Sequence, residues 1–289
     1  MTLKVLTLNL WNDQGPYERR RERIREWIAR LDPDVVGFQE VLKGDGVDTA
    51  ADQVPSDYHI EFACAIPFWL DRRREFGNAV ASRWPITGRE VLTLPEGGDE
   101  TRVALSVTID APFGELSFTT THLNWKLHHG MVRERQVVPL CDTVLKRRPR
   151  GGFPPIVTGD FNAEPDSTEI RYVSGFHAID DRSVQFYDAW RIAGDGGPGY
   201  TWSNRNAYAR IALEPERRID YVFVGYPVQL GESYGLGHVQ RCTVVCDDAK
   251  DGVWPSDHFG VYAELQDSPQ PMPEVLRQQI ERISRARGS

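Results

Sequence analysis

The sequence has few cysteines and no long apolar run. Four cysteines in 289 residues are too few for the disulfide framework of a small secreted domain. Cys242 and Cys246 fall in one expected strand, about 13 Å apart, which is too far for a disulfide. No stretch approaches the roughly 18 apolar residues that span a membrane, and residues 1–10 lack the layout of a signal peptide. We therefore expect a cytoplasmic protein with reduced cysteines.

A surplus of positive charge is also missing. The formal net charge of −8 argues against a dedicated, tight nucleic-acid binder, but not against an enzyme that cleaves a polyanion. Hydrophobic content of 40% and charged content of 26% are those of a soluble globular protein. The length favours one large domain, expected at residues 1–266. The tail at 267–289 fits a short helix, docked on the body or frayed, and we expect a monomer.

Helical and strand patterns alternate along the chain. Within Tyr17–Leu31, apolar residues recur at helical spacing, and a second helix carries Val137, Leu140, Cys141 and Val144 on one face. Several middle strands are adjacent and hairpin-like. Two mixed sheets packed face to face, with helices outside, satisfy both patterns, so we predict a four-layer α/β/β/α sandwich. Strands are expected at 3–8, 34–38, 58–62, 78–82, 91–94, 103–109, 116–121, 155–158, 219–224, 243–245 and 259–265.

Polar residues of similar chemistry stand at the ends of these strands. Each alone has a structural explanation, such as a turn formed by its own side chain. Asp220 differs, because it lies inside an otherwise apolar strand, where a carboxylate is costly unless it is paired. Its partner is either a histidine, or Arg217 or Arg218 at the sheet surface. The strand-end residues are Asn9, Gln39-Glu40, His122 with Asn124, Asp160 with Asn162, and Asp257-His258.

Six motifs carry a family resemblance: LTLNLW, VVGFQE, TTTHLN, TGDFNAEPDS, RRIDYVFV and PSDHFGV. In this order, from about residue 3 to residue 265, they resemble the endonuclease/exonuclease/phosphatase superfamily. That superfamily includes pancreatic deoxyribonuclease, abasic-site endonucleases, inositol polyphosphate phosphatases and neutral sphingomyelinases. The resemblance implies an α/β/β/α sandwich with the active site at one edge of the two sheets. It also implies metal-dependent hydrolysis of phosphoesters by a water nucleophile.

The resemblance assigns a metal site and a water-activating group. Glu40 is the expected ligand of Mg²⁺, for which Mn²⁺ is a possible substitute, because hard cations prefer oxygen ligands. Asn9 and Asp257 match positions in or beside the metal shell. Asp160 matches the residue that orients and activates the attacking water. Asn162 is expected to hold that water or a phosphate oxygen.

Histidines supply the remaining catalytic roles. His258 is expected to donate to the phosphate or to act as general base, with Asp220 fixing its tautomer and favouring its charged form. His122 matches a second histidine that acts as an acid or a phosphate contact. A nucleophile triad in Ser256-Asp257-His258 is excluded, because Asp257 and His258 are expected on opposite faces of an extended segment. Ser256 is then a turn residue.

Substrate contacts are expected from Asn124, which lies two residues after His122, and from Trp254. Trp125 and Trp202 are further candidates for the walls of the site. The loop 64–76 combines aromatic residues with three arginines, which suits stacking on a base or contact with a lipid headgroup. We expect a nuclease or related phosphodiesterase. The alternatives are a sphingomyelinase-like or inositol phosphoester hydrolase, and a non-catalytic binding module of the same fold.

Overall fold

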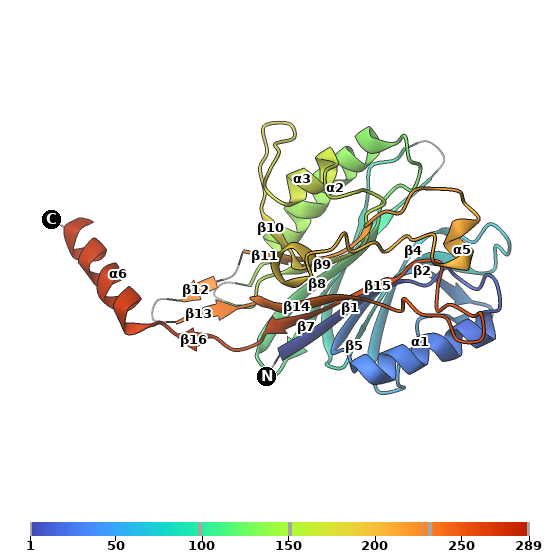
Figure 1. Cartoon of the computed structure of the whole chain (residues 1–289), viewed down its shortest axis with the longest axis horizontal. Coiled ribbons are helices and arrows are strands. Elements are labelled where there is room, and N and C mark those ends of the chain that lie inside the picture. Colours follow the sequence, from blue (N-terminus) through green and yellow to red (C-terminus); the bar gives the residue numbers. More distant parts are fainter. Residues whose placement is uncertain (1, 98–99, 150–151, 227, 231–232, 288–289) are drawn as a thin grey trace.

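The computed structural model describes residues 2–97, 100–149, 152–226, 228–230 and 233–287. Two large twisted sheets form its centre (Figure 1). One has seven strands in the order β14-β15-β1-β2-β5-β4, with β3 paired to β2. Strands β1 and β2 are parallel and the other pairs are antiparallel. The bounds are β1 (Thr2–Asn9), β2 (Val35–Gly44), β3 (Val47–Asp48), β4 (His59–Pro67), β5 (Glu75–Ser82), β14 (Val239–Val245) and β15 (Gly260–Gln266).

The second sheet has six strands in the order β10-β11-β9-β8-β7-β6. Only the pair of β8 and β9 is parallel. The helix α2 connects these two strands, as a parallel pair requires. The bounds are β6 (Ile86–Thr93), β7 (Val103–Ala111), β8 (Gly114–His122), β9 (Ile156–Asp160), β10 (Phe186–Asp188) and β11 (Asp220–Gly225).

Three apolar clusters hold the layers together. Leu105 and Val107 from one sheet meet Val5 and Val261 from the other in a shared core. A second cluster packs α1 on the outer face of the seven-stranded sheet, and a third packs α2 and α3 on the six-stranded sheet. The predicted four-layer α/β/β/α sandwich is therefore confirmed. The helices are α1 (Tyr17–Leu31), α2 (Gly130–Lys146), α3 (Thr168–Val173), α4 (Ala189–Ala193) and α5 (Ala207–Arg210).

The C-terminal part forms a small appendage. A three-stranded sheet comprises β12 (Val228–Leu230), β13 (Ser233–Leu236) and β16 (Gln270–Pro271), and α6 (Glu274–Arg287) follows it. Figure 1 shows α6 projecting from the body at the end opposite α5. The expected tail helix thus exists, and it projects rather than docking on the sandwich. No described helix is long and apolar enough to cross a membrane, and all four cysteines are free thiols.

Strand β2 contains a β-bulge that bears on the site. Its pairing with β5 shifts by one residue between Phe38 and Val41, so Gln39 and Glu40 together face one residue of β5. Glu40 takes up the extra length with a left-handed φ of 55°. Gln39 donates from its amide to the Thr120 hydroxyl oxygen at 2.8 Å, between the two sheets. The bulge therefore gives the consecutive side chains of Gln39 and Glu40 different surroundings.

Candidate active site

Three neighbouring strands of the six-stranded sheet align polar side chains. His122 on β8 is the register partner of Asp160 on β9, and Asp160 is the register partner of Asp220 on β11. Directly paired residues present their side chains on the same face of a sheet. Gly159 allows this close pairing, because at its φ of 143° a Cβ would lie 2.0 Å from the Thr121 carbonyl oxygen. The sheet register thus brings together three residues that are far apart in the sequence.

His258 reaches this row from the other sheet, in the loop before β15. Its Nδ1 lies 2.9 Å from Asp220 Oδ2, and its Nε2 lies 3.7 Å from Asp160 Oδ2. The alternative partners of Asp220 are engaged elsewhere, because Arg217 pairs with Glu214 and Arg218 pairs with a different aspartate. Asp220 is therefore the carboxylate behind His258.

Burial and charge set the protonation states of this pair. Burial alone disfavours a charged imidazole, but Asp220 and Asp160 outweigh it and hold the pKa of His258 well above the ordinary value. Burial and the Asp220 carboxylate raise the pKa of Asp160 to about 7, although His258 and hydrogen bonds from Asn162 and Asn9 act in the opposite direction. A charged His258 therefore stands beside a carboxyl group that titrates near neutral pH.

His122 lies on the other side of Asp160 and has the opposite character. Its Nε2 is 3.4 Å from Asp160 Oδ2, and its ring is buried. Burial, with added repulsion from Arg102 and His258, lowers the pKa of His122 well below the ordinary histidine value. Its Nδ1 has no hydrogen-bond partner among the described residues. The two histidines that flank Asp160 are thus one charged and one neutral.

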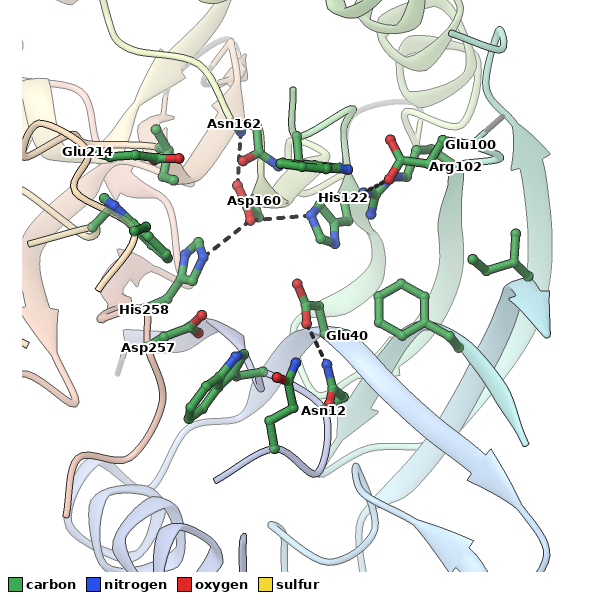
Figure 2. Close-up of a pocket in the computed structure, with 18 of the residues that line it drawn as sticks. Asn12, Glu40, Glu100, Arg102, His122, Asp160, Asn162, Glu214, Asp257 and His258 are labelled. Carbon is green, nitrogen blue, oxygen red and sulfur yellow. Dashed lines mark hydrogen bonds and ion pairs between the residues drawn. The ribbon is translucent and has the colours of Figure 1, made fainter. Parts of the chain in front are cut away.

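Two further carboxylates face this row across an open space. Figure 2 shows Glu40 and Asp257 pointing toward the gap below His258, Asp160 and His122. Glu40 comes from the bulge in β2 and Asp257 from the loop before β15. All five side chains line one cavity of about 570 Å³. The cavity therefore has carboxylates on one wall and an acid–base row on the other.

The Glu40 wall fits a hard divalent cation. Burial raises the pKa of Asp257 to about 6, and repulsion from Glu40 adds to this shift, so the two carboxylates share one electrostatic environment. The amide of Asn12 donates to Glu40 Oε2 at 2.9 Å, while its buried Oδ1 lacks a hydrogen-bond partner among the described residues. Mg²⁺ or Mn²⁺ would fit here, because the wall offers the oxygen ligands that hard cations prefer. The cation would also offset the repulsion between the two carboxylates and give the Asn12 amide oxygen a partner.

Asn9 is present at this wall in an orientation unsuited to coordination. Its Nδ2 donates to Glu40 Oε1 at 3.3 Å and to Asp160 Oδ2 at 3.1 Å. Its Oδ1 accepts from the Trp11 backbone N–H at 3.0 Å. In this arrangement Asn9 links the two carboxylates, and direct coordination by its oxygen would require the amide to turn over.

A second group of possible ligands consists of Asp160, Asp220 and His258, whose ligand atoms lie within 4.8 Å of one another. We favour an acid–base role for this group. A histidine must be neutral to bind a metal, whereas two carboxylates hold the pKa of His258 well above its usual range.

Two expected substrate contacts lie outside the cavity lining. Asn124 is fully buried, and its amide donates to Glu100 Oε2 at 2.8 Å. Trp254 stacks on Phe259 with ring centroids 5.7 Å apart. Neither side chain lines the cavity, because each is engaged by a neighbour behind its wall. Of the other expected wall residues, Trp125 and Trp202 do line it.

The predicted geometry of the Asp257-His258 segment is wrong. Asp257 and His258 form a bend rather than part of a strand, and both side chains line the same cavity. The Asn206 amide fixes the bend by donating to the carbonyl oxygens of Ser256 and Asp257 at 2.7 and 3.0 Å. Ser256 donates to the Asn9 carbonyl oxygen at 2.7 Å, so its hydroxyl joins the two segments and does not act as a nucleophile.

Several cavity residues have no counterpart in the sequence predictions. Arg102 pairs with Glu100, and Arg217 pairs with Glu214, so each cavity arginine has its own acidic partner. Asn12 is a further cavity residue that the sequence did not predict. The signal that could reveal it is an asparagine in a short loop after a strand, because asparagine tolerates the left-handed φ of 38° found there. Asn162 lines the cavity as expected, and its backbone N–H donates to Asp160 Oδ1 at 2.9 Å.

Solved structures of other proteins share the overall fold of this chain. The crystal structure of D. rerio TDP2 complexed with single strand DNA product matches with a TM-score of 0.71 at 18% identity, over 92% of this chain and 99% of that chain. An endonuclease/exonuclease/phosphatase from Beutenbergia cavernae DSM 12333 matches with a TM-score of 0.65 at 25% identity, over 92% of this chain and 71% of that chain.

A sequence relative is similar along nearly its whole length. The uncharacterized protein F14F9.5 of Caenorhabditis elegans is 22% identical over 307 residues, covering 91% of this chain and 90% of its own. The family model described as Endonuclease/Exonuclease/phosphatase family matches residues 6–258, which include every motif residue of the cavity. The chain therefore belongs to the endonuclease/exonuclease/phosphatase family, which supports a hydrolase of the phosphoesterase or nuclease type.

Proposed function

We propose that the chain is a divalent-metal-dependent phosphodiesterase that uses water as the nucleophile. The observation that carries the proposal is the opposition, across one cavity, of the Asp220–His258–Asp160 row and the Glu40–Asp257 carboxylates. One wall offers proton transfer and a charged hydrogen-bond donor, and the other offers oxygen ligands. Hydrolysis of a phosphodiester needs both kinds of group within reach of one phosphorus atom.

The acid–base row performs the proton transfers. Asp160, in its ionised form, accepts a proton from the attacking water, which its carboxylate and the neighbouring Asn162 hold in place. His258 donates from Nε2 to a phosphate oxygen, and Asp220 keeps the ring charged and its Nδ1 protonated. His122, held neutral by burial, contacts the leaving-group side as a donor or proton carrier.

Glu40 and Asp257 are the residues that would hold the cation, with Asn12 and Asn9 beside them. When bound, Mg²⁺ neutralises charge on the phosphoryl oxygens and the leaving group, and Mn²⁺ is a substitute of similar chemistry. The second alternative, a non-catalytic binding module, is not favoured, because three carboxylates, two histidines and Asn162 from the family motifs line the cavity.

Two substrate classes deserve a direct test. Nucleic acid is supported by the TDP2 structure that contains single-stranded DNA product. A lipid phosphoester is the alternative. An inositol polyphosphate is less suited, because Arg102 and Arg217 are each paired with a glutamate, and several phosphates need several available cations.

The experiment is a substrate panel assayed with Mg²⁺, with Mn²⁺ and with a chelator. The panel contains bis(p-nitrophenyl) phosphate, single-stranded DNA, plasmid DNA, RNA, sphingomyelin and inositol phosphates. We expect metal-dependent hydrolysis of a phosphodiester, and no release from any substrate would refute the proposal. His258→Ala and Asp160→Asn should each lower the rate by at least about a hundredfold. The matched control is His238→Ala, an exposed histidine outside the cavity, which should retain activity.

A further inference from the structure

Large apolar side chains are exposed around the mouth of the catalytic cavity. The loops that follow β4, β8 and α5 each line the cavity, through Trp69, Trp125 and Ala212. Each of these segments also exposes large apolar residues within two positions of its lining residue, and Met131 at the start of α2 follows the loop after β8. We call this set the apolar rim: Trp69, Leu70, Trp125, Leu127, Met131, Ile211 and Leu213.

The exposure of the rim is high for aliphatic residues. Leu213 is 90% exposed and Ile211 is 76% exposed, and they flank Ala212 in the cavity wall. Leu70 is 72% exposed beside Trp69. Single exposed apolar residues are common on soluble proteins, whereas a group around one opening marks an interaction surface.

The backbone at Leu213 gives an independent observation. Leu213 has a φ of 58°, in the left-handed region that a bulky side chain rarely occupies. Such a conformation is unfavourable and persists at sites where it serves a function. Here it holds the most exposed leucine of the rim outward, next to Glu214, which pairs with the cavity residue Arg217.

The composition of the apolar rim favours a lipid surface over a nucleic acid as its partner. Nucleic acids are bound by aromatic stacking and by cationic grooves. Leucine, isoleucine and methionine have no π face, and they make up five of the seven rim residues. The arginines of the β4–β5 loop are largely neutralised, since Arg73 pairs with Asp71 and Arg74 pairs with Asp13. Aliphatic side chains flanked by exposed tryptophans instead suit the boundary between lipid headgroups and acyl chains.

We propose that the apolar rim docks on a zwitterionic lipid surface, so that the cavity receives the phosphodiester of a lipid. This inference rests on the proposed phosphodiesterase function and names its substrate class. A net charge of −8 disfavours approach to an anionic leaflet, which is why the surface is zwitterionic. Insertion of the rim brings the mouth of the cavity to the headgroups, and a single lipid phosphate then reaches the space between Glu40 and His258.

The test measures binding to extruded phosphatidylcholine vesicles by sedimentation and by intrinsic tryptophan fluorescence, to which Trp69 and Trp125 contribute. The rim variant is Ile211→Ser with Leu213→Ser. The matched control, Leu145→Ser with Ile192→Ser, changes one exposed leucine and one exposed isoleucine that do not line the cavity. Both proteins are also assayed on bis(p-nitrophenyl) phosphate in solution.

We expect the rim variant to bind vesicles at least about tenfold more weakly than the wild type, while the control binds normally. Both should hydrolyse the soluble diester at wild-type rates, because neither change touches the proposed catalytic groups. Hydrolysis of vesicle-borne sphingomyelin should fall in parallel with binding.

Three outcomes would overturn the inference. The first is a wild type that hydrolyses the soluble diester but does not bind vesicles, which leaves the phosphodiesterase proposal intact. The second is loss of vesicle binding in Val275→Ser with Leu276→Ser on α6, with no change in the rim variant. The third is a rim variant impaired on a single-stranded oligonucleotide with vesicle binding unchanged. Vesicle binding without turnover of any diester would instead refute the phosphodiesterase function and retain the docking surface.

Discussion

Replacement of Asp220 by asparagine is the sharpest perturbation of the proposed mechanism. The change keeps the shape of the side chain and removes its charge. Asp220 Oδ2 lies 2.9 Å from His258 Nδ1, and both residues are almost fully buried. Without the carboxylate, burial becomes the stronger influence, and the pKa of His258 falls. The imidazole then becomes neutral at a lower pH and donates poorly to a phosphate oxygen.

The size of the effect follows from the geometry. Removing one partner of a buried ion pair costs about 3–5 kcal/mol, since the remaining charge is left uncompensated. Because the pKa of His258 is raised in the folded protein, this stability is fully present below the ordinary histidine pKa of 6.5. It is lost as the pH rises through the raised value. The stability difference between wild type and variant should therefore shrink at alkaline pH.

Catalysis should suffer as well. Loss of the carboxylate behind a catalytic histidine lowers kcat by about a thousandfold or more in systems of similar geometry. The assay is the pH profile of kcat with bis(p-nitrophenyl) phosphate and Mg²⁺, together with urea unfolding at pH 6 and pH 9. The control is Asp188→Asn, because Asp188 is also buried and pairs with Arg218, but does not line the cavity. Activity of Asp220→Asn within about threefold of wild type would refute the role given to the pair.

Four other changes test separate parts of the site. Glu40→Gln should raise the Tm of the metal-free protein, because the change removes the repulsion between Glu40 and Asp257. It should also weaken Mg²⁺ binding at least about tenfold, as measured by calorimetry. A lower Tm of the metal-free variant would contradict this. The kcat/KM should fall as the pH drops below about 7, because protonated Asp160 cannot accept a proton; a profile flat to about pH 5 would contradict it. Gly159→Ala should destabilise by more than about 3 kcal/mol in urea, since its Cβ would overlap a carbonyl oxygen, and an unchanged midpoint would show that the backbone relaxes. Asn124→Ala should lower the free energy of unfolding by about 1–3 kcal/mol and leave KM unchanged. A raised KM would show that Asn124 contacts the substrate.

The four-layer architecture could be predicted from the sequence because the apolar residues of the main helices recur at regular helical spacing. The expected apolar face of the second helix, with Val137, Leu140, Cys141 and Val144, is the buried face of α2. The row of His122, Asp160 and Asp220 was predictable as a set, since each residue ends or begins a buried strand. Its order across the sheet was not, because register depends on the pairing of strands far apart in the chain.

The remaining errors arise where loops depart from regular geometry. Alternation predicts opposite faces for Asp257 and His258, but hydrogen bonds from Asn206, about 50 residues away, bend the segment. Asn124 lies two residues after His122, beyond the end of β8, and does not line the cavity, because Glu100 accepts a hydrogen bond from its amide. Asn12 has no motif at all. In each case the deciding contact is a long-range hydrogen bond, which local patterns do not encode.

The bulge at Glu40 means that the length of β2 matters as much as its residue types. Gln39 faces the interior between the sheets, and Glu40 enters the cavity because one extra residue separates Phe38 from Val41. Deletion of Gln39 would keep the glutamate in the chain but restore regular pairing, and would turn its charge toward Thr120 in the interior. An alignment that scores only residue identity would still record an intact ligand there, although the carboxylate had left the site.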